Sequence, residues 1–129
     1  MLLGVDYGKV HVGLALSESG LPAPLQSFST KSDERKLDLI EKSVQDNNIE
    51  GIVIGKGSGQ LVPHIRGFIS KLKKRVTVPV FNIDETLTSN VAVEHMIKHN
   101  VSRKKRKTLE HAYAACILLS LYYEQSKQY

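Results

Sequence analysis

Two short apolar segments near the start of the chain, residues 2–6 and 11–17, predict a pair of β-strands. Both segments are rich in Leu and Val, and only the link YGKV separates them. So short a link favours an antiparallel hairpin. A third strand is predicted near 25–29, after a segment that contains the turn residues Gly20 and Pro22.

The next two elements follow the helical period, with apolar residues at every third or fourth position. The segment KSDERKLDLIEKSVQDNN places Leu37, Ile40 and Val44 in one stripe, and Ser32 before them is a candidate N-cap. A second helix is predicted over 62–74. Its inward residues are expected to be Ile65, Phe68, Ile69 and Leu72.

In the second half of the chain, a short, fully apolar strand is predicted over 52–54 and a buried strand over 78–83, on either side of the helix over 62–74. Strand–helix–strand crossovers imply parallel pairing. Further helices are predicted near 90–99 and over 108–124, with a basic loop between them. This order predicts an α/β protein with a ribonuclease H-like fold. We expect a mixed five-stranded sheet flanked by helices, with the first three strands antiparallel and the last two parallel to the first.

The length of 129 residues suits one hydrophobic core, so we expect a single domain over 1–129. No apolar run approaches the roughly 20 residues of a membrane helix, and no signal-peptide pattern opens the sequence. The one cysteine, Cys116, excludes an internal disulfide and fits a reducing compartment. We therefore expect a cytoplasmic protein that does not act at a membrane.

The net charge of the chain is +5 at pH 7, which favours polyanionic partners such as nucleic acids. The main basic cluster is SRKKRK, residues 102–107, and a smaller one is KLKKR, residues 71–75. A run of like charge is often only a solvated surface. Contact with phosphate is therefore one of two interpretations of these clusters.

Acidic residues close two of the predicted strands: Asp6 ends the first strand, and Asp84 and Glu85 follow the strand over 78–83. In open α/β sheets, ligands bind beyond the carboxyl ends of the strands. If these two strands are neighbours, Asp6 and Glu85 meet, and a cation or a proton must lie between them. Mg²⁺ and Mn²⁺ suit such oxygen ligands and can activate water for attack on a phosphodiester.

The last predicted helix, TLEHAYAACILLSLYYE, begins with two polar residues, Glu110 and His111. Each shares a helix face with apolar residues further along, so either side chain could reach the acidic cluster. The small pair Ala114–Ala115 would let this helix approach the sheet closely. Periodicity alone does not choose between Glu110 and His111.

Each of these residues also has a purely structural interpretation. Asp6 could form a turn, Asp84 could bind backbone amides at the start of a helix, and His111 could be an ordinary half-buried histidine. The joint occurrence of acidic strand ends, a polar pair opening an apolar helix and a basic segment beside it favours a functional site.

Several segments resemble motifs of the YqgF (RuvX) family, relatives of the Holliday junction resolvases with a ribonuclease H-like fold. GVDYGKVHVGLALS resembles the opening motif of the family, and VFNIDETLTS its Asp-Glu-Arg-Leu-Thr-Thr motif. EHAYAACILL resembles its last motif, in which an Asp stands three residues before Ala-Ala, and IEGIVIG is similar to its central strand. The resemblance implies a metal-dependent nuclease that processes the 5′ end of pre-16S ribosomal RNA.

The resemblance also implies roles for the matching residues. Asp6 and Glu85 match the metal-binding acids of the family, with Mg²⁺ or Mn²⁺ as cofactor. Asp84 matches the leading acid of the second motif and would lie beside the metal. The last acid of the family falls on His111, next to Glu110, so one or both of these would complete the catalytic set.

The chain departs from the family pattern at several positions. An imidazole at His111 would hold Mg²⁺ less firmly than a carboxylate, but it could favour Mn²⁺ or carry a proton near neutral pH. Val10–His11 replaces the usual basic pair, and Thr86 replaces an Arg. The candidate contacts to nucleic acid are Lys9, His11, Lys56, Ser58, Arg103, Lys104, Lys105, Arg106 and Lys107.

Other functions remain open at this point. A module that binds nucleic acid without catalysis would keep the fold after losing the third acid. A DNA junction resolvase is another alternative, and resolvase relatives act as dimers on a two-fold substrate. The partner is expected to be structured RNA or branched DNA, and a homodimer and a monomer both remain open. The Asp-x-Gly hairpin also opens the sugar-kinase, actin and heat-shock-protein ATPases, but these need two such domains. The loop GKGSGQ lacks the G-x-G-x-x-G spacing of dinucleotide sites and favours a plain crossover turn.

Overall fold

The computed structural model describes residues 1–84 and 103–126, and over 103–108 it describes the backbone alone. The helix predicted near 90–99 and the acid Glu85 lie outside the described residues. Within the described ranges, no helix combines the length and the apolar character needed to cross a membrane.

Five strands form one sheet, and their bounds are β1 Leu2–Tyr7, β2 His11–Glu18, β3 Leu21–Ser29, β4 Gly51–Gly55 and β5 Val80–Ile83. The strand order is β3-β2-β1-β4-β5. The pairs β1–β2 and β2–β3 are antiparallel, whereas β4 lies parallel to both β1 and β5. The predicted mixed five-stranded sheet is therefore confirmed.

The condition under which Asp6 and Glu85 would meet directly is not fulfilled, because β1 and β5 are not neighbours. β4 lies between them, and its Ile54 pairs with Val5 on one side and Asn82 on the other. Since adjacent strands lie about 4.8 Å apart, β1 and β5 are separated by about 10 Å. The three strands run parallel, so their carboxyl ends still share one edge of the sheet. We name this edge, which carries Asp6 and Asp84, the carboxyl edge.

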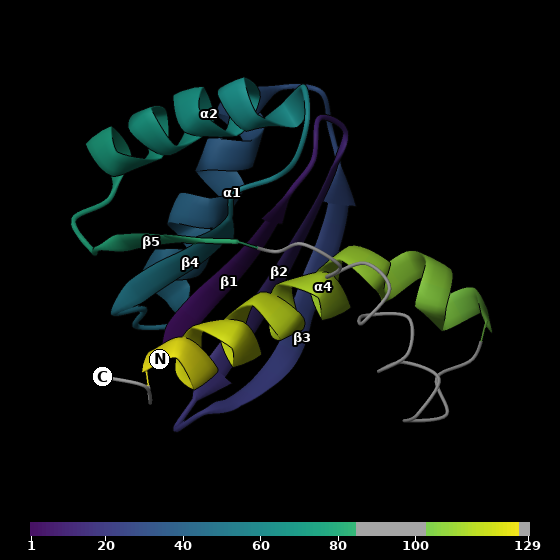
Figure 1. Cartoon of the computed structure of the whole chain (residues 1–129), viewed down its shortest axis with the longest axis vertical. Helices are drawn as coiled ribbons and strands as arrows, with labels where there is room; N and C mark the ends of the chain where they lie inside the picture. Colours follow the sequence, from purple (N-terminus) through teal and green to yellow (C-terminus); the bar gives the residue numbers. More distant parts are fainter. Residues whose placement is uncertain (85–102, 127–129) are drawn as a thin grey trace.

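The described helices are α1 Asp33–Asp46, α2 Leu61–Arg75 and α4 Arg103–Ser126. α1 and α2 lie on one face of the sheet, and α4 crosses the other face (Figure 1). A core therefore fills each side of the sheet. The inward residues predicted for α2 are confirmed, since all four are buried: Ile65, Phe68, Ile69 and Leu72.

The helix starts agree with the sequence in one case and differ in another. Ser32 caps α1 as predicted, because its Oγ accepts a hydrogen bond from the Arg35 amide at 3.2 Å. α4 begins at Arg103 and not at Thr108, so the basic segment 103–107 is helical where a loop was predicted. Lys and Arg are good helix formers, but a charged segment has no apolar period to reveal the helix.

The alternation of side chains along β1 assigns its residues to two layers. Leu3, Val5 and Tyr7 belong to the core beneath α1 and α2. Gly4 and Asp6 lie between them in the sequence and therefore face the opposite side, where α4 lies. The strand period thus directs Asp6 toward α4.

Two glycines of the sheet let α4 lie directly on β1 and β2. A Cβ atom at Gly4 would lie 2.6 Å from the carbonyl oxygen of Ala115. A Cβ atom at Gly13 would overlap the carbonyl group of His111. Ala115 itself is fully buried, so small residues on both sides of this contact allow the close approach that the Ala114–Ala115 pair predicted.

β3 forms one edge of the sheet and contains two prolines, Pro22 and Pro24. Both pair with residues of β2, and Leu25 is an extra residue where the register between the two strands shifts. The third strand therefore begins earlier than predicted, at Leu21. An edge strand tolerates proline because one side of its backbone has no partner strand.

Candidate active site

Asp6 lies at the carboxyl edge, beneath α4. It is the next-to-last residue of β1, opposite Gly13 of β2, and its side chain is 19% exposed. Because Gly13 has no side chain, the backbone of α4 comes close to the sheet at this point. The local sequence therefore places a largely buried carboxylate against the helix.

His111 is the α4 residue that contacts Asp6. Its Nδ1 lies 2.9 Å from Asp6 Oδ2, and the N–H donates to the carboxylate. The sequence pattern left Glu110 and His111 as alternatives, and the structure brings His111 to Asp6. Glu110 is half-buried, and its negative charge acts on the His111 ring.

The contact with Asp6 raises the pKa of His111 above its ordinary value of 6.5. The hydrogen bond is the largest cause, burial of the ring opposes it, and the charges of Asp6 and Glu110 add to it. An imidazole whose Nδ1–H is held by a carboxylate keeps Nε2 for a proton or a metal ion. Asp6 and His111 together can therefore bind a cation or move a proton.

His11 lies beside this pair. Its ring stacks on the ring of His111, with 5.1 Å between the centroids and 16° between the planes. Its Nδ1 is 2.8 Å from Ser29 Oγ of β3. The sequence analysis missed this stack. It could have been inferred from the alternation of side chains along the strands, because in a paired hairpin His11 lies on the same sheet face as Asp6.

β3 also contributes to holding this part of α4 on the sheet. The backbone N–H of Ala112, directly after His111, donates to Ser27 Oγ at 3.1 Å. Ser27 was not among the predicted site residues. A serine on an exposed edge strand gives no signal in a single sequence, because its partner comes from a distant helix.

A buried lysine fixes the turn that follows Asp6. The side chain of Lys36 in α1 is 1% exposed. Its Nζ donates to the carbonyl oxygens of Gly8 at 3.0 Å and Lys9 at 2.7 Å, and to Asp33 Oδ1 at 3.3 Å. With three acceptors, this ammonium group is compatible with burial. The turn between β1 and β2 is therefore bound to α1.

Tyr7 completes the Lys36 contact on the same face of the sheet. Its ring centroid lies 4.6 Å from Lys36 Nζ, and its hydroxyl donates to Asp33 Oδ1 at 3.0 Å. Burial, followed by the interaction with Asp33, raises the pKa of Tyr7 to about 12. The sequence analysis missed Lys36, although it stands four residues before Ile40 and so on the apolar stripe.

The predicted phosphate contacts Lys56 and Ser58 lie on the loop between β4 and α2, which starts at the carboxyl edge. Both side chains are exposed. The Lys56 amide donates to the carbonyl oxygen of Ile83 at 2.8 Å, which holds the loop to β5. Gly57 adopts a φ of 74°, a conformation that favours glycine. Lys9, in the hairpin turn, is also exposed.

At the carboxyl edge, the Asp6 carboxylate and the His111 imidazole lie within hydrogen-bond distance of each other, and both are suitable donors for a metal ion. Within the described residues, no group of three or more His, Cys, Asp and Glu is arranged to hold an ion. Asp84 is exposed after the end of β5, whereas Glu85 and the side chains of 103–107 lie outside the described residues. A carboxylate with an imidazole fits Mn²⁺ better than Mg²⁺, which prefers oxygen ligands.

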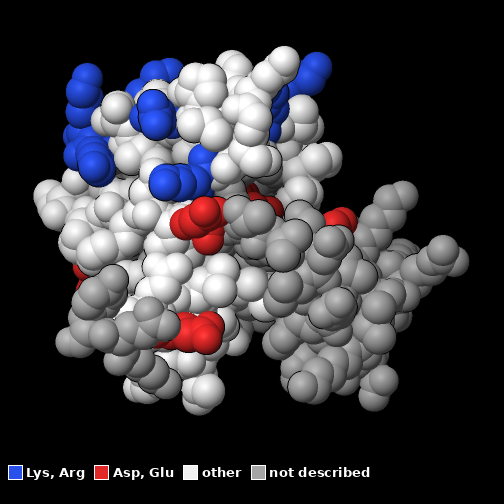
Figure 2. Space-filling view, in the orientation of Figure 1, with Lys and Arg blue, Asp and Glu red and all other residues white. Residues whose placement is uncertain are grey.

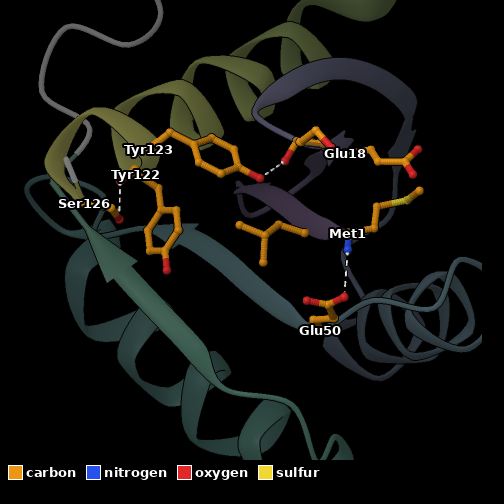
Figure 3. A pocket seen from close by; sticks show the side chains of 9 residues that line it. Met1, Glu18, Glu50, Tyr122, Tyr123 and Ser126 are labelled. Atoms are coloured by element: carbon orange, nitrogen blue, oxygen red, sulfur yellow. Dashed lines mark hydrogen bonds and ion pairs between the residues drawn. The ribbon is translucent and has the colours of Figure 1, made fainter.

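A separate hollow of about 590 Å³ lies at the other end of β1 from Asp6 (Figure 3). Tyrosines of α4 line one side of it, and Met1 and Glu50 line another. The ammonium group of Met1 lies 3.4 Å from the Glu50 carboxylate, and the Tyr123 hydroxyl lies 2.5 Å from Ser17 Oγ. The length of β1 separates this hollow from the carboxyl edge.

Comparison of the sequence with protein families gives a match to the family model described as "RuvX: Holliday junction resolvase" over residues 1–125. A relative from Natranaerobius thermophilus is 30% identical over 96% of this chain and 94% of its own length. A relative from Orientia tsutsugamushi is 34% identical over 92% of this chain and 80% of its own length. Both carry the name "Putative pre-16S rRNA nuclease".

Solved structures of two resolvases share the fold. RuvC from T. thermophilus, in complex with a Holliday junction substrate, has a TM-score of 0.61 at 16% identity over 97% of this chain and 94% of that chain. The fowlpox virus resolvase, in complex with Holliday junction DNA, has a TM-score of 0.61 at 12% identity over 99% of both chains. The family match and the two sequence relatives show that this chain belongs to the RuvX family.

Proposed function

We propose that this protein is a divalent-metal-dependent nuclease that hydrolyses phosphodiester bonds in structured RNA, as in the 5′-end processing of pre-16S ribosomal RNA. Family membership and the names of the sequence relatives support a nuclease. The observation that carries the proposal is the contact between Asp6 and His111 at the carboxyl edge. Ligands of open α/β sheets bind at this type of edge.

We assign the binding of Mg²⁺ or Mn²⁺ to Asp6, Glu85 and Asp84, with His111 beside them. The bound ion would supply a water of lowered pKa and stabilise charge on the leaving oxygen. Asp6 is held by the hydrogen bond from His111, so its carboxylate is oriented before an ion arrives.

His111 would carry the proton of the reaction. With Nδ1 bound to Asp6, its Nε2 can take a proton from the attacking water or return one to the leaving oxygen. The stacked ring of His11 restricts the orientation of the His111 ring. Glu110 would favour the protonated form of His111 through its charge.

Cations around the carboxyl edge would hold the nucleic acid backbone. Lys9 and Lys56 are exposed on the two loops at this edge, and Ser58 follows Lys56 in the same loop. His11 lies exposed next to the Asp6–His111 pair. The five cations of the segment 103–107 lie at the start of α4, the helix whose His111 contacts Asp6.

The test is cleavage of labelled structured RNA and labelled branched DNA in Mg²⁺, Mn²⁺ or EDTA. We expect the wild type to cut the RNA only with a divalent ion, and faster with Mn²⁺. Asp6→Asn should abolish cleavage and retain binding, because asparagine keeps the shape of the side chain but not its charge. Asp46→Asn, an exposed acid of α1, is the matched control. Cleavage by purified Asp6→Asn at the wild-type rate would refute the mechanism, and preferential cutting of branched DNA would identify a junction resolvase.

A nucleic-acid-binding module without catalysis is the second candidate. The observation that favours it is that no group of three or more potential metal ligands forms within the described residues, where Asp6 and His111 form a pair. Calorimetric titration with Mn²⁺ separates the two candidates. Binding that is lost in Glu85→Gln supports the nuclease. RNA binding without any Mn²⁺ binding at millimolar concentration supports the module.

A further inference from the structure

Helix α2 carries an unusual concentration of positive charge. Its sequence, LVPHIRGFISKLKKR, contains five Lys and Arg residues and no acid. Figure 2 shows Lys and Arg side chains gathered at the top of the molecule, where Figure 1 places α2, while the Asp and Glu side chains lie lower in the view. This surface is separate from the carboxyl-edge cations already assigned to the site.

One of the five cations has a structural role. The guanidinium group of Arg75 contacts three acids of α1, at 2.9 Å for Glu41, 2.5 Å for Asp38 and 3.5 Å for Glu34. These contacts raise the pKa of Arg75 further, with the Asp38 hydrogen bond as the largest cause. Arg75 therefore joins α2 to α1.

The other four cations lack such partners. Their side chains are exposed, and no salt bridge within the described residues includes any of them: Arg66, Lys71, Lys73 and Lys74. The apolar face of α2 is turned to the core, so these cations share the solvent face of the helix. We name them the α2 cations.

The helix itself explains only part of this arrangement. Cations in the last turn, such as Lys73 and Lys74, interact favourably with the negative end of the helix dipole. Arg66 stands in the second turn, nearer the positive end, and gains nothing from the dipole. Lys71 faces the like charge of Lys74 at a spacing of three residues, which disfavours a helix. A polyanion on this face would account for both Arg66 and Lys71.

We propose that the α2 cations bind the phosphate backbone of the nucleic acid substrate at a distance from the bond that is cut. This inference rests on the proposed function. α2 starts after the loop of Lys56 at the carboxyl edge and extends away from it over 15 residues, or about 22 Å. At the spacing of about 3.4 Å between phosphates on one strand of B-DNA, this span corresponds to roughly six base pairs, and to somewhat more in the A-form helix of RNA. The substrate must therefore have an arm that extends well beyond the cleavage site.

The experiment compares the binding of two fluorescently labelled RNA hairpins in EDTA, where no cleavage occurs. Both hairpins carry the same single-stranded end, but one stem has about 3 base pairs, clearly shorter than the estimated reach of α2, and the other has about 20. The test variant is Arg66→Gln/Lys71→Gln. Its matched control is Arg35→Gln/Lys42→Gln, which removes the same charge from exposed positions of α1 among several acids.

The test variant should bind the long hairpin roughly tenfold more weakly than the wild type. The salt dependence of its binding should correspond to the release of about two fewer counterions. Its binding to the short hairpin and its melting temperature should not change. The control should bind both hairpins like the wild type. A second control, Arg75→Gln, should melt at a lower temperature and still bind the long hairpin normally.

Unchanged binding of the long hairpin by Arg66→Gln/Lys71→Gln would overturn the assignment of α2, and so would an equal loss on both hairpins. These outcomes leave the proposed function intact, because the wild type still binds RNA. Failure of the wild type to bind either hairpin would instead refute the proposed RNA substrate, and the assignment of α2 with it.

Discussion

The hydrogen bond between Asp6 and His111 changes how a carboxyl-edge site responds to protons. A second carboxylate at position 111 would repel Asp6 and would require a cation between them. An imidazole attracts Asp6 instead, so the pair is stable without an ion. The Asp6–His111 pair therefore forms without an ion, and its protonation state depends on pH in a range where two carboxylates would stay charged.

Because of the Asp6–His111 hydrogen bond, we expect part of the unfolding free energy to depend on pH. The substitution His111→Gln should remove this part. The folded-state pKa of His111 is raised above 6.5, so the folded protein binds the proton more tightly than the unfolded chain. The stabilisation is complete below about pH 6.5 and is lost as the pH rises through the raised pKa. In metal-free buffer, the difference in unfolding free energy between wild type and His111→Gln should therefore shrink as the pH rises above about 6.5.

Urea denaturation at a series of pH values measures this difference. His64→Gln, which removes an exposed histidine of α2, is the matched control. A wild-type advantage over His111→Gln that stays constant, or grows, as the pH rises would show that the proton is not bound as the structure implies.

At the scale of the elements, the β1–β2 hairpin is held from both faces of the sheet. Lys36 of α1 binds the carbonyl groups of its turn from one side. α4 lies on Gly4 and Gly13 from the other side. The position of Asp6 at the end of β1 therefore depends on two contacts that belong to different helices.

Lys36→Met should destabilise the protein by about 1–3 kcal/mol, because it removes the donor for the Gly8 and Lys9 carbonyl groups while keeping the length of the side chain. Lys42→Met, at an exposed position of the same helix, should change stability by less than about 0.5 kcal/mol. Chemical denaturation of both variants measures the effect. Equal stability of the two variants would mean that the buried ammonium group contributes nothing to the hairpin.

A pair of Gly→Ala substitutions tests the close contact between α4 and the sheet. Gly13→Ala should destabilise by about 3 kcal/mol or more, because its methyl group would overlap the His111 carbonyl group in a rigid contact. Gly67→Ala, on the exposed face of α2, has nothing within 4 Å of the added methyl group and should stabilise by up to about 1 kcal/mol. Thermal melting of both variants should give shifts of opposite sign, and a neutral Gly13→Ala would contradict the packing of α4.

At the scale of the whole molecule, the periodicity of the sequence predicted the features that depend on nearby residues, namely the positions of the strands and the buried faces of helices. It located all five strands and the four inward residues of α2, because apolar alternation reports which face of an element is buried. It did not reveal that β4 separates β1 from β5, because strand order depends on contacts between distant segments. The starting point of α4 was missed for a different reason, since a segment of Lys and Arg has no apolar period.

The sequence also predicted only part of the candidate site. Asp6 was identified because an acid at a strand end stands out from an apolar segment. The choice of His111 over Glu110 required the structure, since both occupy the first turns of the same apolar helix surface. Lys36 was missed because a lysine near a helix start normally extends into solvent, and only its three acceptors make its burial possible.

The two prolines of β3 have a consequence for self-association. An exposed edge strand invites the corresponding strand of another copy to extend the sheet across two molecules. Pro22 and Pro24 have no backbone N–H to offer such a strand, and the extra residue Leu25 disturbs the spacing of the remaining donors. Copies of this protein should therefore not join through β3 into a continuous sheet.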